Sequence, residues 1–259
     1  MRFLFGLVLA LSACALRAEI PPLLDEAWTN YVRDIDHWAF TETTHALDAT
    51  GKTTREAVMR YDPSLPYAEQ FTDISHNGIP PTDKQVEQAR QRGVARGERL
   101  ERPGGEENDA QPRVVLNGSR MLADLEHATI STENSESITY AIPLHAEGGK
   151  ASPMDKFQTL VRVSKTTRAF EHVEIHLSAP MRMALVAKLN QAAFTIDFTT
   201  VDPKFSPAST RLTDHMALTM FFFKKREGGH EMVRSDFKRV TPYRDRFGVK
   251  VGPMRTIDF

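Results

Sequence analysis

The segment His172-Val-Glu174-Ile-His176 is the stretch of this chain whose residue types come nearest to a metal-binding pattern. In an extended strand its three polar side chains point to one face, and His172 then lies about 13 Å from His176. Zinc holds its ligands within about 2.2 Å of the ion, so these two histidines cannot bind the same one. We therefore interpret the segment as the solvated face of a strand, with Val173 and Ile175 on the opposite, buried face.

No other pattern predicts catalysis. His37, His76 and His215 stand near the expected ends of secondary-structure elements, where turn and surface roles are common. The motifs G-x-S-x-G, H-E-x-x-H, G-x-x-x-x-G-K and G-x-G-x-x-G are absent from the sequence. We therefore predict no catalytic residue, metal ion or cofactor, and we expect a non-enzymatic protein. A hydrolase whose residues meet only in three dimensions remains an alternative.

The N-terminus has the layout of an export signal. Arg2 is followed by an apolar run over residues 3–11 and then by small residues up to Ala18. A permanent membrane span needs about 20 apolar residues, and this run is shorter. We predict that residues 1–18 are a signal peptide and that the protein reaches the bacterial periplasm or envelope.

Two cleavage sites overlap inside this signal. Leu11-Ser-Ala-Cys14 resembles a lipobox, in which Cys14 is acylated and becomes a lipid anchor on an outer-membrane-tethered lipoprotein. Ala13-Cys-Ala15 also fits ordinary cleavage, which removes Cys14 and releases a periplasmic protein. Both sites remain open, and membrane contact is expected only through the acyl anchor. Cys14 is the only cysteine, so the folded part has neither a disulfide nor a thiol nucleophile.

The charge balance argues against nucleic acid as a partner. The chain has 33 basic and 34 acidic residues, and loss of Arg2 and Arg17 with the signal leaves a net charge of about −3. The arginines between residues 90 and 99 are not accompanied by aromatic residues that stack on bases. We interpret them as a solvated helix face.

Residues 22–35 are predicted to form an amphipathic helix. Their apolar side chains recur at offsets of three and four residues, which places them in one stripe. Pro22 suits the first turn, and Asp25 and Glu26 favour the positive end of the helix dipole. This helix must cover an apolar surface.

The rest of the first half is expected to alternate strands with a polar helix. A hairpin is predicted from Trp38 to Tyr61 with its turn at residues 48–51, and a short strand is predicted over residues 70–75. The capping box Thr82-Asp-Lys-Gln85 predicts a helix to about Arg92. A mobile loop over residues 97–112 and a short helix over residues 119–126 follow.

The second half reads almost entirely as strands. They are predicted over residues 128–144, 157–164, 169–178, 215–225 and 231–240, with the last two joined by a turn at Glu227-Gly-Gly-His230. Residues 181–193 fit either a strand or a helix, and as a strand they require a bulge near Asn190-Gln191.

This order of elements predicts an α+β fold with one curved, mostly antiparallel sheet, an incomplete barrel whose concave face is covered by helices. We expect a single domain over residues 19–242 and a C-terminal tail over residues 243–259. With its export signal, its length and this element order over residues 22–242, the chain resembles the LolA/LolB class of periplasmic lipoprotein carriers. The resemblance implies an open β-structure, closed by helices, that holds acyl chains.

Methionines are frequent in the β-rich half, and their flexible thioether side chains adapt to irregular apolar ligands or fill an imperfect core equally well. The leading hypothesis is an exported protein that binds a lipid or acyl chain in the curved sheet. The residues expected to contact this ligand are Trp28, Tyr31, Met181, Met183, Leu185, Met220 and Phe222. The alternative is an interaction module with a filled core, whose partner is another envelope protein.

Overall fold

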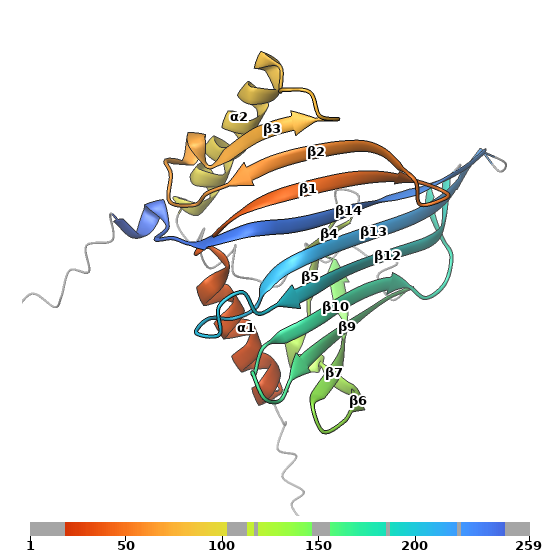
Figure 1. Ribbon diagram of the computed structural model, residues 1–259. Helices are drawn as coiled ribbons and strands as arrows, with labels where there is room; N and C mark the ends of the chain where they lie inside the picture. The colour runs from red at the N-terminus through yellow and green to blue at the C-terminus, as the bar shows by residue number, and fades with distance from the viewer. Residues whose placement is uncertain are drawn as a thin grey trace, which may run out of the picture.

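The structure is a computed structural model and describes residues 19–102, 113–116, 119–146, 156–184, 187–221 and 224–246. These residues form a large antiparallel sheet, a smaller sheet and two α-helices (Figure 1). The helices are α1 (Pro22–Ile35) and α2 (Asp83–Leu100). The expected class, α+β with a curved antiparallel sheet that stays open, is confirmed.

The large sheet contains eleven strands. They are β1 (Trp38–Asp48), β2 (Thr53–Tyr61), β3 (Phe71–His76), β6 (Thr129–Glu133), β7 (Ser137–Ile142), β9 (Phe157–Ser164), β10 (Phe170–Leu177), β11 (Met181–Ala184), β12 (Ala187–Thr199), β13 (Ala208–Met220) and β14 (Lys224–Arg239). Their order is β3-β2-β1-β14-β13-β12-β10-β9-β7-β6, with β11 paired to β12. Strands β3 and β6 stand at opposite edges. The last long strand, β14, pairs with the first, β1, so the two halves of the chain share one sheet.

The smaller sheet and the short helices complete the described part. The smaller sheet is formed by β4 (Arg113–Leu116), β5 (Ser119–Ala123) and β8 (Leu144–Ala146), and the 3-10 helices are η1 (Tyr67–Glu69), η2 (Leu125–His127) and η4 (Tyr243–Arg246). Among the described residues, neither α1 nor α2 combines the length and apolar character that crossing a membrane requires.

Helix α1 forms where the apolar stripe predicted it and begins with Pro22. Leu24 and Ala27 are only 1% exposed and pack with Val161, Val163 and other side chains of one core cluster. Because the helix contributes one stripe to this core, its stability depends on the sheet beneath it.

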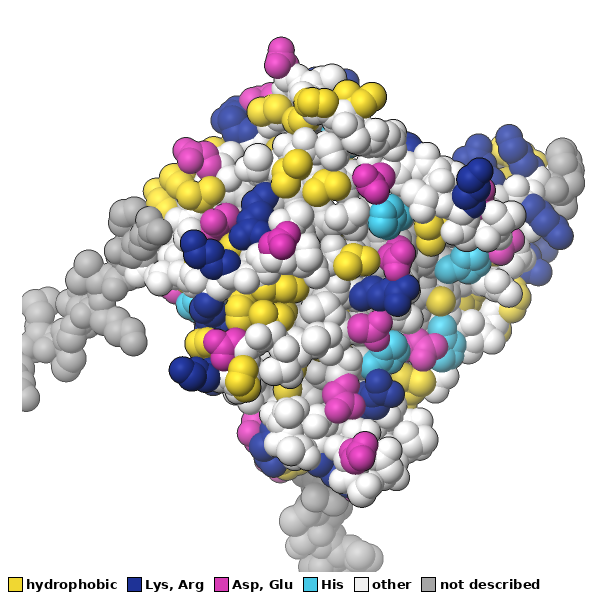
Figure 2. Space-filling view, viewed as in Figure 1, with side chains coloured by type: hydrophobic (Ala, Val, Ile, Leu, Met, Phe, Trp, Pro, Cys, Tyr) yellow, Lys and Arg dark blue, Asp and Glu magenta, His cyan; other side chains and the backbone are white. Residues whose placement is uncertain are grey.

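Two neighbouring cross-strand rows of the large sheet differ in polarity. Residues opposite each other on neighbouring antiparallel strands point to the same face, so each cross-strand row can be assigned to one face. On the face that packs against the helices, which we call the inner face, one row is small or apolar: Ala57, Thr44, Met232, Leu212, Ile196 and Val173. The row one residue along points to the outer face and is polar: Glu56, His45, Glu231, Thr213, Thr195 and Glu174. In Figure 2 acidic, basic and histidine side chains are spread across the strands in view.

The prediction of a short helix over residues 119–126 is wrong. Residues Ser119–Ala123 form β5, and only a single turn, η2, follows. The backbone of β5 pairs with β4 on one side and β8 on the other, so tertiary pairing overrides local helix propensity. Asp124 then caps η2 by accepting a hydrogen bond from the backbone N–H of His127 at 3.2 Å.

The prediction of a turn at Glu227-Gly-Gly-His230 is also wrong. Gly228 and Gly229 lie inside β14, and the hairpin turns instead after Met220, where Phe221 has a φ of 50°. A Cβ atom on Gly229 would lie 1.9 Å from the carbonyl oxygen of Asp214. The two glycines therefore allow close approach of neighbouring strands rather than a reversal of the chain.

Helix α2 is longer than expected. Its capping box at Thr82 and Gln85 is confirmed, but the helix continues beyond Arg92 to Leu100. Gly93 and Gly97, which lie beyond the expected end of the helix, face η1. Residues 97–100 of the expected loop are thus helical.

For residues 181–193 the strand alternative is confirmed. Met181–Ala184 and Ala187–Thr199 are strands, and the register against β13 shifts between Leu189 and Gln191, where the bulge was expected. The predicted signal over residues 1–18, with Cys14, and the tail beyond residue 246 lie outside the described residues.

Candidate functional site in a groove between helix α2 and the sheet

Trp28 and Tyr31, two of the residues expected to contact a ligand, form an aromatic cluster on α1. The ring of Tyr31 lies 5.7 Å from Phe170 and 5.6 Å from Phe198, both edge to face, and Trp28 lies 6.1 Å from Phe170. Burial raises the pKa of Tyr31 to about 12. These rings pack against one another and form part of the core.

The expected methionines lie elsewhere. Met181 is buried in a separate cluster with Leu189 and Ala192, and Met220 pairs with Ala187 at the end of β13. Met183 lies in β11, but its side chain is outside the described part of the structure, as are Leu185 and Phe222. Of the expected ligand residues whose side chains the structure describes, Trp28 and Tyr31 therefore belong to one cluster, Met181 to another, and Met220 to neither.

The structure instead forms a groove between α2 and strands β1 to β3. Its main hollow has a volume of about 720 Å³, within the roughly 300–1,000 Å³ that is usual for a small-molecule site. Thr44, Ala57 and Met59 line it from the sheet, and Gln88 and Gln91 line it from the helix.

A second hollow of about 420 Å³ adjoins the first and extends the groove toward the β1–β2 turn. The two hollows share Thr44, Ala57, His76 and Gln85. Ala46, Arg55 and other residues line the extension.

The groove exists because of two features of the sequence. Its floor contains small side chains, Thr44, Ala46 and Ala57, which leave space above the sheet. Helix α2 does not fill this space because its glycines dock on η1. A Cβ atom on Gly93 would lie 1.8 Å from the carbonyl oxygen of Tyr67.

Charged side chains along the main hollow are neutralised in pairs. Glu42 accepts a hydrogen bond from Arg234 at 2.9 Å, and Asp73 accepts one from Arg92 at 2.8 Å. His76 also lies 3.4 Å from Asp73. These pairs leave the floor between them as the uncharged part of the groove.

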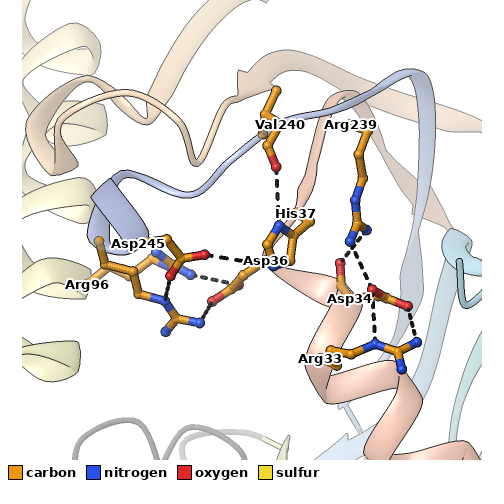
Figure 3. Close-up of polar contacts among 9 residues, drawn as sticks. Arg33, Asp34, Asp36, His37, Arg96, Arg239, Val240 and Asp245 are labelled. Carbon is orange, nitrogen blue, oxygen red and sulfur yellow. Dashed lines mark hydrogen bonds and ion pairs between the residues drawn. The ribbon is translucent and has the colours of Figure 1, made fainter. Parts of the chain in front are cut away.

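A network of ion pairs around Asp34 and Asp36 joins the end of α1 to β14 and α2, next to the groove (Figure 3). Asp34 is 2% exposed and accepts hydrogen bonds from Arg33 at 3.0 Å, from Arg239 at 2.9 Å and from the backbone N–H of Ser206 at 3.0 Å. Burial alone would raise its pKa, but these donors lower the pKa of Asp34 to about 2.

Asp36, two residues farther on, ties the same corner to α2 and to η4. Its carboxylate accepts a hydrogen bond from Arg96 at 2.8 Å and lies 3.2 Å from Arg244 (Figure 3). Nδ1 of His37 lies 3.2 Å from the carbonyl oxygen of Val240. Because these charges are partnered within the network, we assign it a positioning role.

All nine histidines lie within 4.0 Å of a carboxylate oxygen. His172 contacts Asp197 at 2.7 Å, whereas His176 contacts Glu174 at 3.1 Å, so the two histidines of the alternating segment have different partners. Within the described residues, no group of three or more His, Cys, Asp and Glu side chains is arranged to hold a metal ion.

Sequence reasoning missed the groove because alanines and threonines on a strand carry no chemical signature. A usable signal was present in α2. Gln85, Gln88 and Gln91 recur every three residues, while the small residues Ala89, Gly93 and Gly97 recur every four. Two such rows on one helix indicate a close-packed face beside a polar one.

Comparison of the chain with protein-family models, with curated proteins and with solved structures gives no match in any of the three.

Proposed function

We propose that this protein is an exported, non-enzymatic envelope protein that binds an apolar ligand, a lipid or an acyl chain, on the inner face of its sheet. The LolA/LolB resemblance, with a periplasmic or outer-membrane-tethered location, belongs to the same proposal. In this proposal the ligand lies in the groove between α2 and the sheet rather than at the ligand-contacting residues that the sequence predicts.

The cross-strand row on the inner face carries the proposal. It crosses six strands, from Val173 in the core beneath α1 to Thr44 and Ala57 on the floor of the groove. All six residues are partly exposed. A continuous row of small or apolar side chains that remains accessible to solvent and ends in a groove is suited to an elongated apolar molecule.

Native mass spectrometry of the gently purified full chain tests this function. We expect a stoichiometric lipid adduct on the wild-type protein. Ala57→Phe fills the groove floor and should remove the adduct, because a phenyl ring occupies the space above the sheet.

The matched control is Ala217→Phe, the same substitution on the outer face, opposite Glu227. It should retain the adduct. A wild-type protein that stays free of lipid, even after incubation with lipid vesicles, would overturn the proposed function.

One observation favours the competing function, an interaction module. Ile74 and Ile79, at the edge strand β3 and the turn after it, are 46% and 67% exposed. An exposed edge with apolar side chains is a common docking surface for a protein partner. A lipid-free chain that co-purifies with one envelope protein, and loses it in Ile79→Asp, would support this function instead.

A further inference from the structure

Among the residues that the structure describes, one charged residue of the groove is not neutralised by its surroundings. Arg55 is exposed on β2 and lines the groove extension. No side chain among the described residues forms a hydrogen bond or ion pair with its guanidinium. The nearby carboxylate of Glu56 is engaged by His45 at 3.2 Å.

The opposite end of the groove differs. There Glu42 is paired with Arg234, and Arg92 is paired with Asp73. As far as the described residues show, the groove is therefore electrically asymmetric, with a cation that has no side-chain partner at one end and neutralised pairs at the other.

A second hydrogen-bond donor lies beside Arg55. The side-chain oxygen of Asn77 accepts the backbone N–H of Glu56 at 2.8 Å, which fixes the amide and leaves its NH2 group as a donor. Asn77 and Arg55 line the same hollow. Together they offer N–H groups to an anion, and a guanidinium fork matches the geometry of a carboxylate or a phosphate.

We propose that the groove binds a single-chain amphiphile with an anionic head, with the head at Arg55 and Asn77 and the chain lying over Ala46, Thr44 and Ala57 toward Met59. This inference rests on the proposed function and adds the class and the orientation of its ligand. Carboxylate and phosphate heads share the required chemistry.

Binding of four ligands with the same twelve-carbon chain tests the inference: laurate, dodecyl phosphate, 1-dodecanol and dodecyltrimethylammonium. Displacement of a fluorescent fatty-acid probe from the full chain gives each dissociation constant. We expect the better anion to bind roughly tenfold more tightly than dodecanol and the cation to bind most weakly, since one charge-assisted hydrogen bond contributes on the order of tenfold in affinity. The stronger of laurate and dodecyl phosphate identifies the head.

Arg55→Gln should weaken anion binding by roughly 5- to 20-fold and leave dodecanol unchanged, and Arg55→Lys should restore part of the loss. Arg99→Gln, which removes an exposed arginine from α2 outside the groove lining, should change neither ligand.

The two proposals fail in different ways. If dodecanol binds as tightly as laurate and dodecyl phosphate, and Arg55→Gln has no effect, the anionic head is wrong while apolar binding stands. If none of the four ligands displaces the probe or binds directly, the proposed function is itself overturned.

Discussion

Arg239, the last residue of β14, donates a hydrogen bond to Asp34 of α1 across 205 positions of sequence, with its Nη2 atom 2.9 Å from Oδ1. The same guanidinium lies 5.2 Å from the ring centre of Trp38 and 3.8 Å from that of Phe205. The first helix is thereby joined to the last long strand by a charge pair whose acidic partner is buried.

Asp34→Asn should destabilise the fold, because the amide leaves Arg33 and Arg239 without their anion. We expect a loss of about 2–4 kcal/mol in the free energy of unfolding, measured by urea denaturation. The control Glu98→Gln changes an exposed carboxylate on α2 that has no partner among the described residues, and it should cost less than about 0.5 kcal/mol. Equal effects of the two substitutions would contradict the buried network.

The lowered pKa of Asp34 predicts a pH dependence of stability. The carboxyl has a pKa of about 2 in the folded state and about 3.9 in the unfolded chain, so the unfolded state binds the proton more readily. Its contribution, about 2 kcal/mol, is complete above about pH 4 and is lost as the pH falls toward 2. Urea unfolding at successive pH values should show the wild type losing its advantage over Asp34→Asn in this interval. Parallel curves for the two proteins would refute the assignment.

Gly93→Ala should destabilise the protein even though alanine is the better helix former by about 1 kcal/mol. The added Cβ would overlap the carbonyl oxygen of Tyr67, so α2 must move away from η1. We expect a net loss of about 1–3 kcal/mol in urea unfolding. Arg99→Ala, on an exposed position of the same helix, is the control and should have little effect. A stabilised Gly93→Ala protein would mean that α2 does not dock on η1.

Gly229→Ala tests the close approach of strand β13 to β14 at Asp214. Inside β14 the new Cβ meets the carbonyl oxygen of Asp214, and we expect a lower midpoint of thermal unfolding and a loss of about 1–3 kcal/mol. Lys225→Ala, at an exposed position of β14, serves as the control. A neutral result for Gly229→Ala would contradict the close approach of β13 to Gly229.

Local signals predicted part of the fold well. Pro22 and the apolar stripe marked α1, the Thr82–Gln85 capping box marked the start of α2, and the phase change near Asn190 marked the bulge in β12. Each of these depends on neighbours within a few residues, which is the range over which the sequence pattern is informative.

The errors share a different cause. Gly228 and Gly229 are expected in a turn, and Gly93 and Gly97 lie beyond the expected end of the helix, but each is required where another segment approaches the backbone closely. The approaching segments are distant in sequence, as Gly93 and Tyr67 are, so no local pattern reveals them. The helix expected over residues 119–126 failed similarly, because the partners of β5 decide its conformation.

The sequence by itself determined the fold class and the placement of most strands, because these follow from local periodicity. Only the tertiary structure decided which residues meet. It packed Trp28 and Tyr31 into the core and opened a groove over Ala57 with Arg55 at its end, because the position of α2 depends on glycine contacts with a distant segment.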